Sequence, residues 1–175
     1  MITKMTRVLM TVAVFGALLP FAAIAQTSGD DPAVQAAKEK TAVVFDLGRI
    51  FGYLQTLEKE QPKLALSAAQ RQEVYAVMET IKATKRLEPN LADELLSRIE
   101  EEILTPSQLT EVDQIAIAKM NERETSSASQ SSGSGGGQIT SYIAGGPFNP
   151  MLDGTKNIGK DFAAYFDLVS KKLGK

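Results

Sequence analysis

The side chains that most often carry out catalysis or bind metals are scarce in this sequence. The chain contains no histidine and no cysteine, which excludes the commonest general base, a thiolate nucleophile and thiolate metal sites. Glu100, Glu101 and Glu102 are consecutive, and three consecutive residues of a helix diverge instead of converging on one ion. The glycine-rich run 133–137 lacks the lysine of a phosphate-binding loop. We expect no catalytic residue, no metal site, no cofactor and no enzymatic activity.

The first 25 residues have the pattern of a cleavable secretory signal peptide. Lys4 and Arg7 precede an apolar segment that starts at Val8, and the segment ends in Ala23-Ile24-Ala25, a small-x-small cleavage pattern. The alternative is an uncleaved anchor, but the apolar stretch is broken by glycine and proline and is near the lower length limit for a membrane span. We therefore predict export across the inner membrane into a bacterial periplasm.

The remainder of the chain has the composition of a mildly acidic protein. The leader removes two positive charges from a chain whose net charge is −2, which gives no reason to expect nucleic acid or an anionic membrane surface as a partner. Because there is no cysteine, disulfides and a lipoprotein anchor are excluded. After residue 25 no segment is apolar enough to span a bilayer, so we expect no stable membrane span after cleavage.

Start and stop signals divide the predicted helical domain, residues 26–124, into four helices. They run from Asp31-Pro32 to about residue 60, from Ser67 to about residue 86, from an Asn90 cap to about residue 104, and from Thr105 to about residue 124. No segment alternates with period two, which favours an all-α fold, a small helical hairpin or bundle.

The first predicted helix carries a coiled-coil-like seam with spacings of four and three residues. Two glycines four residues apart on the same helix suit a close helix–helix approach. Four short helices have few apolar layers, so the sequence is compatible with a homodimer. The seam is the first candidate for its interface. Its residues are Val43, Leu47, Ile50, Leu54 and Leu57, and the glycines are Gly48 and Gly52.

The composition changes after residue 124. Residues 125–137 consist only of Ser, Gly, Ala, Thr and Gln and predict a flexible linker. Residues 138–175 predict a loop followed by an amphipathic helix from about residue 158 to 173. One amphipathic helix cannot form a core alone. It either folds back on the four-helix region, which we favour for the isolated protein, or docks on another molecule.

Two predicted helices begin with the same signal, a leucine followed by a capping box in which Ser or Thr and a Gln three residues later satisfy backbone N–H groups. The copies are Leu66, Ser67 and Gln70, and Leu104, Thr105 and Gln108. The pair resembles the LTxxQ motifs of bacterial periplasmic proteins of the Spy and CpxP type, over about residues 43–124. This resemblance implies a small exported helical protein that acts in envelope stress as an ATP-independent chaperone or an inhibitor of a sensor kinase.

Several large apolar side chains are candidates for a surface that binds other proteins, since methionine repacks easily around varied partners. Their helical spacing favours the alternative that they are core residues. A thin cradle-shaped dimer, with one apolar stripe in the core and another exposed, would be compatible with both interpretations. The candidates are Phe51, Leu54, Met78, Met120, Phe162, Phe166 and Val169.

Two functional hypotheses follow. The first is an exported binding protein, without cofactor, that holds unfolded clients or protein partners as a chaperone or stress adaptor. The second is a structural or assembly subunit of an envelope complex that docks through its C-terminal helix. A metal or stress sensor is the weakest alternative, because histidine and cysteine are absent.

Overall fold

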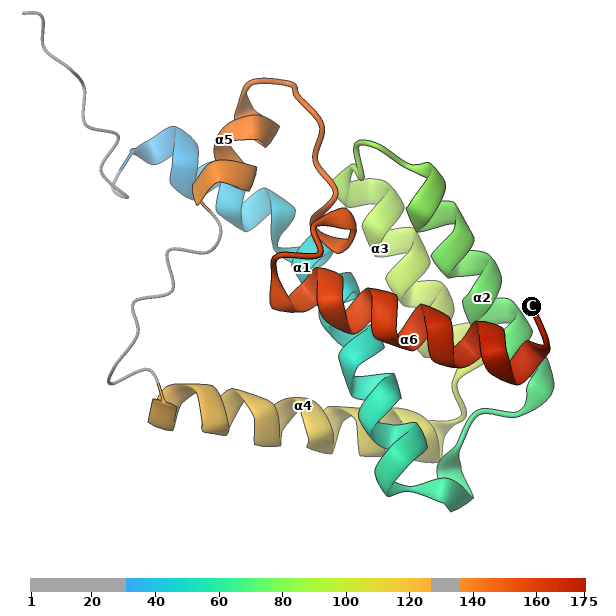
Figure 1. Cartoon of the computed structure of the whole chain (residues 1–175). Coiled ribbons are helices and arrows are strands. Elements are labelled where there is room, and N and C mark those ends of the chain that lie inside the picture. The colour runs from blue at the N-terminus through green and yellow to red at the C-terminus, as the bar shows by residue number, and fades with distance from the viewer. Residues whose placement is uncertain (1–30, 127–135) are drawn as a thin grey trace, which may run out of the picture.

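The computed structural model describes residues 31–126 and 136–175, and within them the chain is all-α (Figure 1). This confirms the predicted all-α class. The predicted signal peptide, residues 1–25, and most of the predicted linker, residues 125–137, lie outside the described residues. The helices are α1 (Pro32–Glu60), α2 (Ala68–Ala83), α3 (Pro89–Ser97), α4 (Pro106–Ser126), α5 (Gly136–Ile143) and α6 (Asn157–Leu173). The short helical segments are η1 (Pro62–Leu64), η2 (Arg98–Ile103) and η3 (Pro150–Leu152).

The helix boundaries follow local signals, with one correction. Asp31 accepts a hydrogen bond from the N–H of Ala33 at 2.8 Å at the start of α1. The third helix does not begin with Asn90 as its cap. It begins at Pro89, with Glu88 in the cap position, because proline already has a helical φ and lacks an N–H that would need a partner. This helix continues into the π-helical segment η2.

The C-terminal helix folds back on the first helix. In Figure 1, α6 lies across α1, and Phe51 of α1 meets the ring of Phe162 edge-on, with centroids 5.1 Å apart. Gly48 permits this approach, since a Cβ at that position would lie 2.5 Å from Cγ2 of Ile158. The helices before and after the predicted linker therefore share one hydrophobic core.

The segment between α5 and α6 is attached to the segment between α2 and α3. The N–H of Leu87 donates to the carbonyl of Phe148 at 2.7 Å, and the N–H of Phe148 donates to the carbonyl of Lys85 at 3.1 Å. Asn149 donates to the carbonyl of Thr84 at 2.7 Å, which gives the end of α2 a partner that it otherwise lacks. Residues 138–157 were predicted as a loop, but residues up to Ile143 belong to α5, because Ile139 and Tyr142 are buried in the core. The segment after α5 fixes the position of α6 through these hydrogen bonds.

Helix α4 leaves the body of the molecule along its length. Its first turns bury Gln108, Val112 and Ile115, whereas Ile117 and Met120 are 58% and 56% exposed. Figure 1 shows α4 crossing α1 and extending away from the other helices. Among residues 31–126 and 136–175, no helix is long and apolar enough to cross a membrane.

Candidate functional site

A groove of about 370 Å³ lies where α4 crosses α1. Its floor is apolar, its rim is charged, and Met120 stands at its exposed end. A pocket of this size falls within the range of about 300–1,000 Å³ that ligand sites occupy. The lining consists of Asp46, Arg49, Ile50 and Tyr53 from α1, Leu96 from α3, Glu100 from η2, and Val112, Asp113, Ala116 and Met120 from α4.

The spacing of the lining residues follows from helical geometry. Asp46, Ile50 and Tyr53 are four and three residues apart and share one face of α1. On α4, Val112, Ala116 and Met120 are each four apart, so they form a row along the helix that faces α1. On α4 the row runs from the buried Val112 to the exposed Met120, and on α1 the buried Ile50 lies between the exposed Asp46 and the half-buried Tyr53. Ile50 and Val112 therefore form an apolar floor, and the groove is open at Met120.

The charged rim of the groove is acidic. Three lining residues are carboxylates and one is a guanidinium, and that guanidinium, Arg49, already pairs with Asp46. Within the part of the chain that the structure describes, no hydrogen bond or ion pair reaches the side chains of Glu100 or Asp113. Burial raises the pKa of the Glu100 carboxyl above its ordinary value, and the charges of Asp113, Glu101 and Asp46 raise it further.

Replacement of Glu100 by Gln is expected to stabilise the protein at neutral pH. Because its pKa is raised in the native state, protonated Glu100 stabilises the fold relative to ionised Glu100. This contribution to the free energy of unfolding is complete below the ordinary pKa of 4.5 and is lost as the pH rises through the native pKa. The gain should be about 0.5 kcal/mol at pH 7, because solvent still screens a carboxyl that is only half-buried, and it should vanish near pH 4. Urea unfolding at both pH values measures it, and an equal gain at both would contradict the electrostatic cause.

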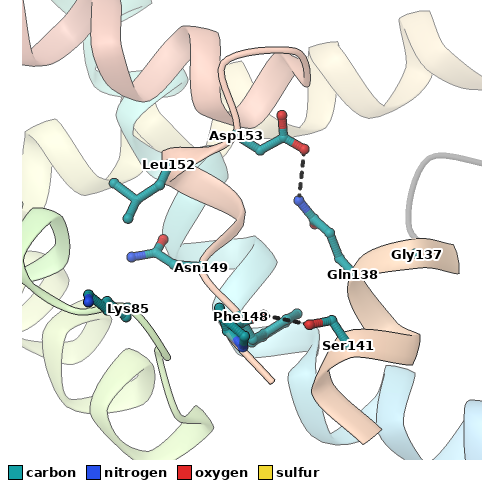
Figure 2. A pocket seen from close by; sticks show the side chains of 9 residues that line it. Lys85, Gly137, Gln138, Ser141, Phe148, Asn149, Leu152 and Asp153 are labelled. Atoms are coloured by element: carbon teal, nitrogen blue, oxygen red, sulfur yellow. Dashed lines mark hydrogen bonds between the residues drawn. The ribbon is translucent and has the colours of Figure 1, made fainter. Parts of the chain in front are cut away.

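A second hollow, of about 400 Å³, lies between α5 and the segment that leads to α6 (Figure 2). Figure 2 shows Gln138 and Asp153 pointing toward one another, and Gln138 Nε2 donates to Asp153 Oδ2 at 3.3 Å. The hydroxyl of Ser141 donates to the carbonyl of Pro147 at 2.7 Å. These polar groups are used to hold the segment together, so the hollow is a weaker candidate for binding than the groove.

The two capping motifs meet in space. Ser67 and Gln70 exchange the two hydrogen bonds of a capping box, as do Thr105 and Gln108. In addition, Gln70 Nε2 donates to Gln108 Oε1 at 2.7 Å. The motif leucines, Leu66 and Leu104, are buried.

Each motif glutamine also reaches the chain that precedes the other motif. Gln70 Nε2 donates to the carbonyl of Ile103 at 2.7 Å, and Gln108 Nε2 donates to the carbonyl of Leu64 at 3.0 Å. The glutamines therefore join the starts of α2 and α4, in addition to capping their own helices.

Alanine substitutions of Gln70 and Gln108 are expected to be non-additive. Each should cost about 1–3 kcal/mol of unfolding free energy, because it leaves a part-buried backbone carbonyl and the other glutamine without that partner. The double variant should cost less than the two single variants together, with a coupling of about 1 kcal/mol, since the shared contact is lost once. Urea unfolding of the four proteins measures this coupling. Additive costs would show that the glutamines act only as separate caps.

A buried ion cluster joins α1, α2 and α6. The side chain of Glu58 is 0% exposed and accepts two hydrogen bonds from Arg71, each 3.0 Å long, and one from Lys172. Burial raises the pKa of Glu58, but the hydrogen bonds and charges of Arg71 and Lys172 outweigh it, so the pKa lies below its ordinary value. Burial and the Glu58 charge raise the pKa of Tyr165, whose hydroxyl has no hydrogen-bond partner among the described residues.

Most of the candidate partner-binding residues lie in the core of the molecule. Phe51, Leu54, Met78, Phe162 and Val169 are buried, because α6 covers the apolar face of α1. This favours the core alternative for them.

Only two of the partner-binding candidates remain accessible. Phe166 is half-buried and stacks on Tyr75 with centroids 5.1 Å apart, and Met120 stands at the mouth of the groove. Most of the seam proposed for a homodimer, from Leu47 to Leu57, is likewise covered within one chain.

No protein-family model, curated protein or solved structure matches this chain. The resemblance to periplasmic proteins of the Spy and CpxP type therefore stays a prediction that depends on the two motifs at Leu66 and Leu104. The groove, by contrast, is defined by the geometry of α1, α3, η2 and α4.

Proposed function

We propose that this protein is an exported, non-enzymatic helical binding protein that holds apolar segments of other proteins, in the manner of an ATP-independent chaperone or an envelope-stress adaptor. The observation that carries the proposal is the open groove between α1 and α4, with Met120 exposed at its mouth. Ile117, also on α4, is a second exposed large apolar side chain. Large exposed apolar side chains next to a concave surface are typical of sites for protein partners. The signal-peptide pattern of residues 1–25 supports the periplasm as the place of action.

The rival hypothesis, a structural subunit that docks through its C-terminal helix, has less support. The apolar face of α6 is buried by Phe51 and its neighbours on α1. To dock elsewhere, α6 would have to leave the core. The exposed surface of α4 could bind a partner without any such rearrangement.

An aggregation assay tests the proposed function. The purified protein should suppress light scattering by a chemically unfolded client at near-stoichiometric amounts. The variant Met120→Glu should lose most of this effect, because it places a charge at the apolar mouth of the groove. Leu152→Glu is the matched control, since Leu152 is 49% exposed and lies in the other hollow. The proposal is overturned if the folded protein does not suppress aggregation, or if both variants behave alike.

A further inference from the structure

The groove between α1 and α4 combines an apolar floor with negative charges from three different elements. Asp46 comes from α1, Glu100 from η2 and Asp113 from α4. The two charges of Asp46 and Asp113 act on Glu100, so the three carboxylates surround one space. Two of these carboxylates, Glu100 and Asp113, form no ion pair with any side chain that the structure describes. Their placement is therefore not explained by ion pairs within the protein.

Carboxylates that repel one another beside an apolar floor reduce the stability of the native state. Positive charge brought by a bound partner would relieve this repulsion. Lysine and arginine suit both parts of the groove, because their aliphatic stems pack on apolar surface while their charged ends reach carboxylates. Apolar neighbours in the same partner would then meet Met120 at the mouth and Ile50 on the floor. The chemistry of the groove thus selects a partner that is both basic and apolar.

We propose that this groove recognises a positively charged, apolar-rich stretch of an unfolded or partly folded protein, in which a lysine or arginine neighbours large aliphatic or aromatic residues. This inference rests on the proposed function and specifies its class of partner. The volume of about 370 Å³ receives side chains of such a stretch and leaves its backbone along the exposed edge of α4. Acidic clients, and polar clients without large apolar residues, are disfavoured.

Three short fluorescent peptides of equal length test the proposal by anisotropy titration. The first contains Leu, Phe and Lys, the second has Glu in place of every Lys, and the third keeps Lys but has Ser in place of Leu and Phe. The protein should bind the first at least tenfold more tightly than either of the others. Added salt should weaken this binding, because screening reduces the attraction. Equal affinity for the basic and acidic apolar peptides would overturn the proposal.

The double variant Glu100→Gln, Asp113→Asn should bind the basic apolar peptide at least tenfold more weakly. Its matched control is Glu39→Gln, Asp167→Asn, which makes the same change in net charge at exposed positions of α1 and α6 and should alter the affinity less than twofold. Loss of the fold cannot explain the expected loss of binding, because removal of the repulsion should stabilise the native state, and thermal unfolding checks this. Equal affinities of the two double variants would contradict the proposed site.

The peptide and aggregation measurements separate the two proposals. If the protein suppresses aggregation but binds the basic and acidic apolar peptides equally, the partner class is wrong and the binding function stands. If the peptide binds with the expected selectivity and aggregation is not suppressed, the chaperone-like function is wrong and the selectivity of the groove stands. If neither is observed, both proposals fail.

Discussion

A chain truncated after residue 126 is expected to lose its cooperative fold. The deletion removes α5 and α6, whose large side chains fill the core against α1 and α2. Each fully buried side chain of this size contributes about 1.5–3 kcal/mol, and the whole stability of a domain is only about 5–15 kcal/mol. The buried residues lost are Ile139, Tyr142, Phe148, Met151, Phe162, Tyr165 and Val169. Far-UV circular dichroism and urea titration should show reduced helicity and no sigmoidal transition.

Addition of a separate peptide covering residues 136–175 provides the control for this truncation. The peptide should restore helicity and cooperative unfolding to the truncated chain, because α6 has its complementary surface on α1. A truncated chain that unfolds cooperatively and keeps the helicity of its four remaining helices would contradict the expectation. It would then favour the rival hypothesis, in which the C-terminal helix serves another molecule.

Replacement of Arg71 by Leu is expected to be among the most destabilising single substitutions on a partly exposed residue. It removes both hydrogen bonds from the buried carboxylate of Glu58 and leaves only Lys172. Loss of one partner of a buried ion pair costs about 3–5 kcal/mol of unfolding free energy. Because Lys172 still pairs with Glu58, we expect this variant to lose about 3 kcal/mol. Urea unfolding at pH 7 measures the cost.

The pH dependence and a double variant identify the cause. The native pKa of Glu58 is lowered, so the ionised carboxylate contributes to the free energy of unfolding. This contribution is complete above the ordinary pKa of 4.5 and is lost as the pH falls through the native pKa. Arg71→Leu should therefore differ less from the wild type at pH 3 than at pH 7. The double variant Glu58→Leu, Arg71→Leu should be more stable than Arg71→Leu, because no buried charge remains unpaired. A double variant that is less stable would show that packing dominates.

The sequence predicted those parts of the fold that have local causes. Pro32 and the caps at Ser67 and Thr105 placed three helix starts, since N-cap geometry depends on a few neighbouring residues. Helix α5 was missed, because a glycine-rich start gives no local signal for a helix. This helix is stabilised because Ile139 and Tyr142 are buried in the shared core. Helical spacing alone does not reveal burial against residues that are distant in the sequence.

The candidate site was predictable only in part. The sequence identified Met120 as a candidate for partner binding, but nothing in it placed Asp46, Glu100 and Asp113 around one space, because that depends on how α4 crosses α1. The ion cluster had one local signal that was overlooked. Glu58 follows Phe51 and Leu54 on the apolar face of α1, and a carboxylate in that position requires a buried partner.

The pairing of the first and last helices has a consequence for biosynthesis. The core cannot close until α6 has left the ribosome, because α1 has its partner at the far end of the chain. Contacts of such long sequence separation form late and slowly. The growing polypeptide is therefore expected to remain open until α6 has been synthesised, and an open chain is the form that the proposed export across a membrane would require. Under the proposed export, the core would close after α6 (Asn157–Leu173) had crossed the membrane.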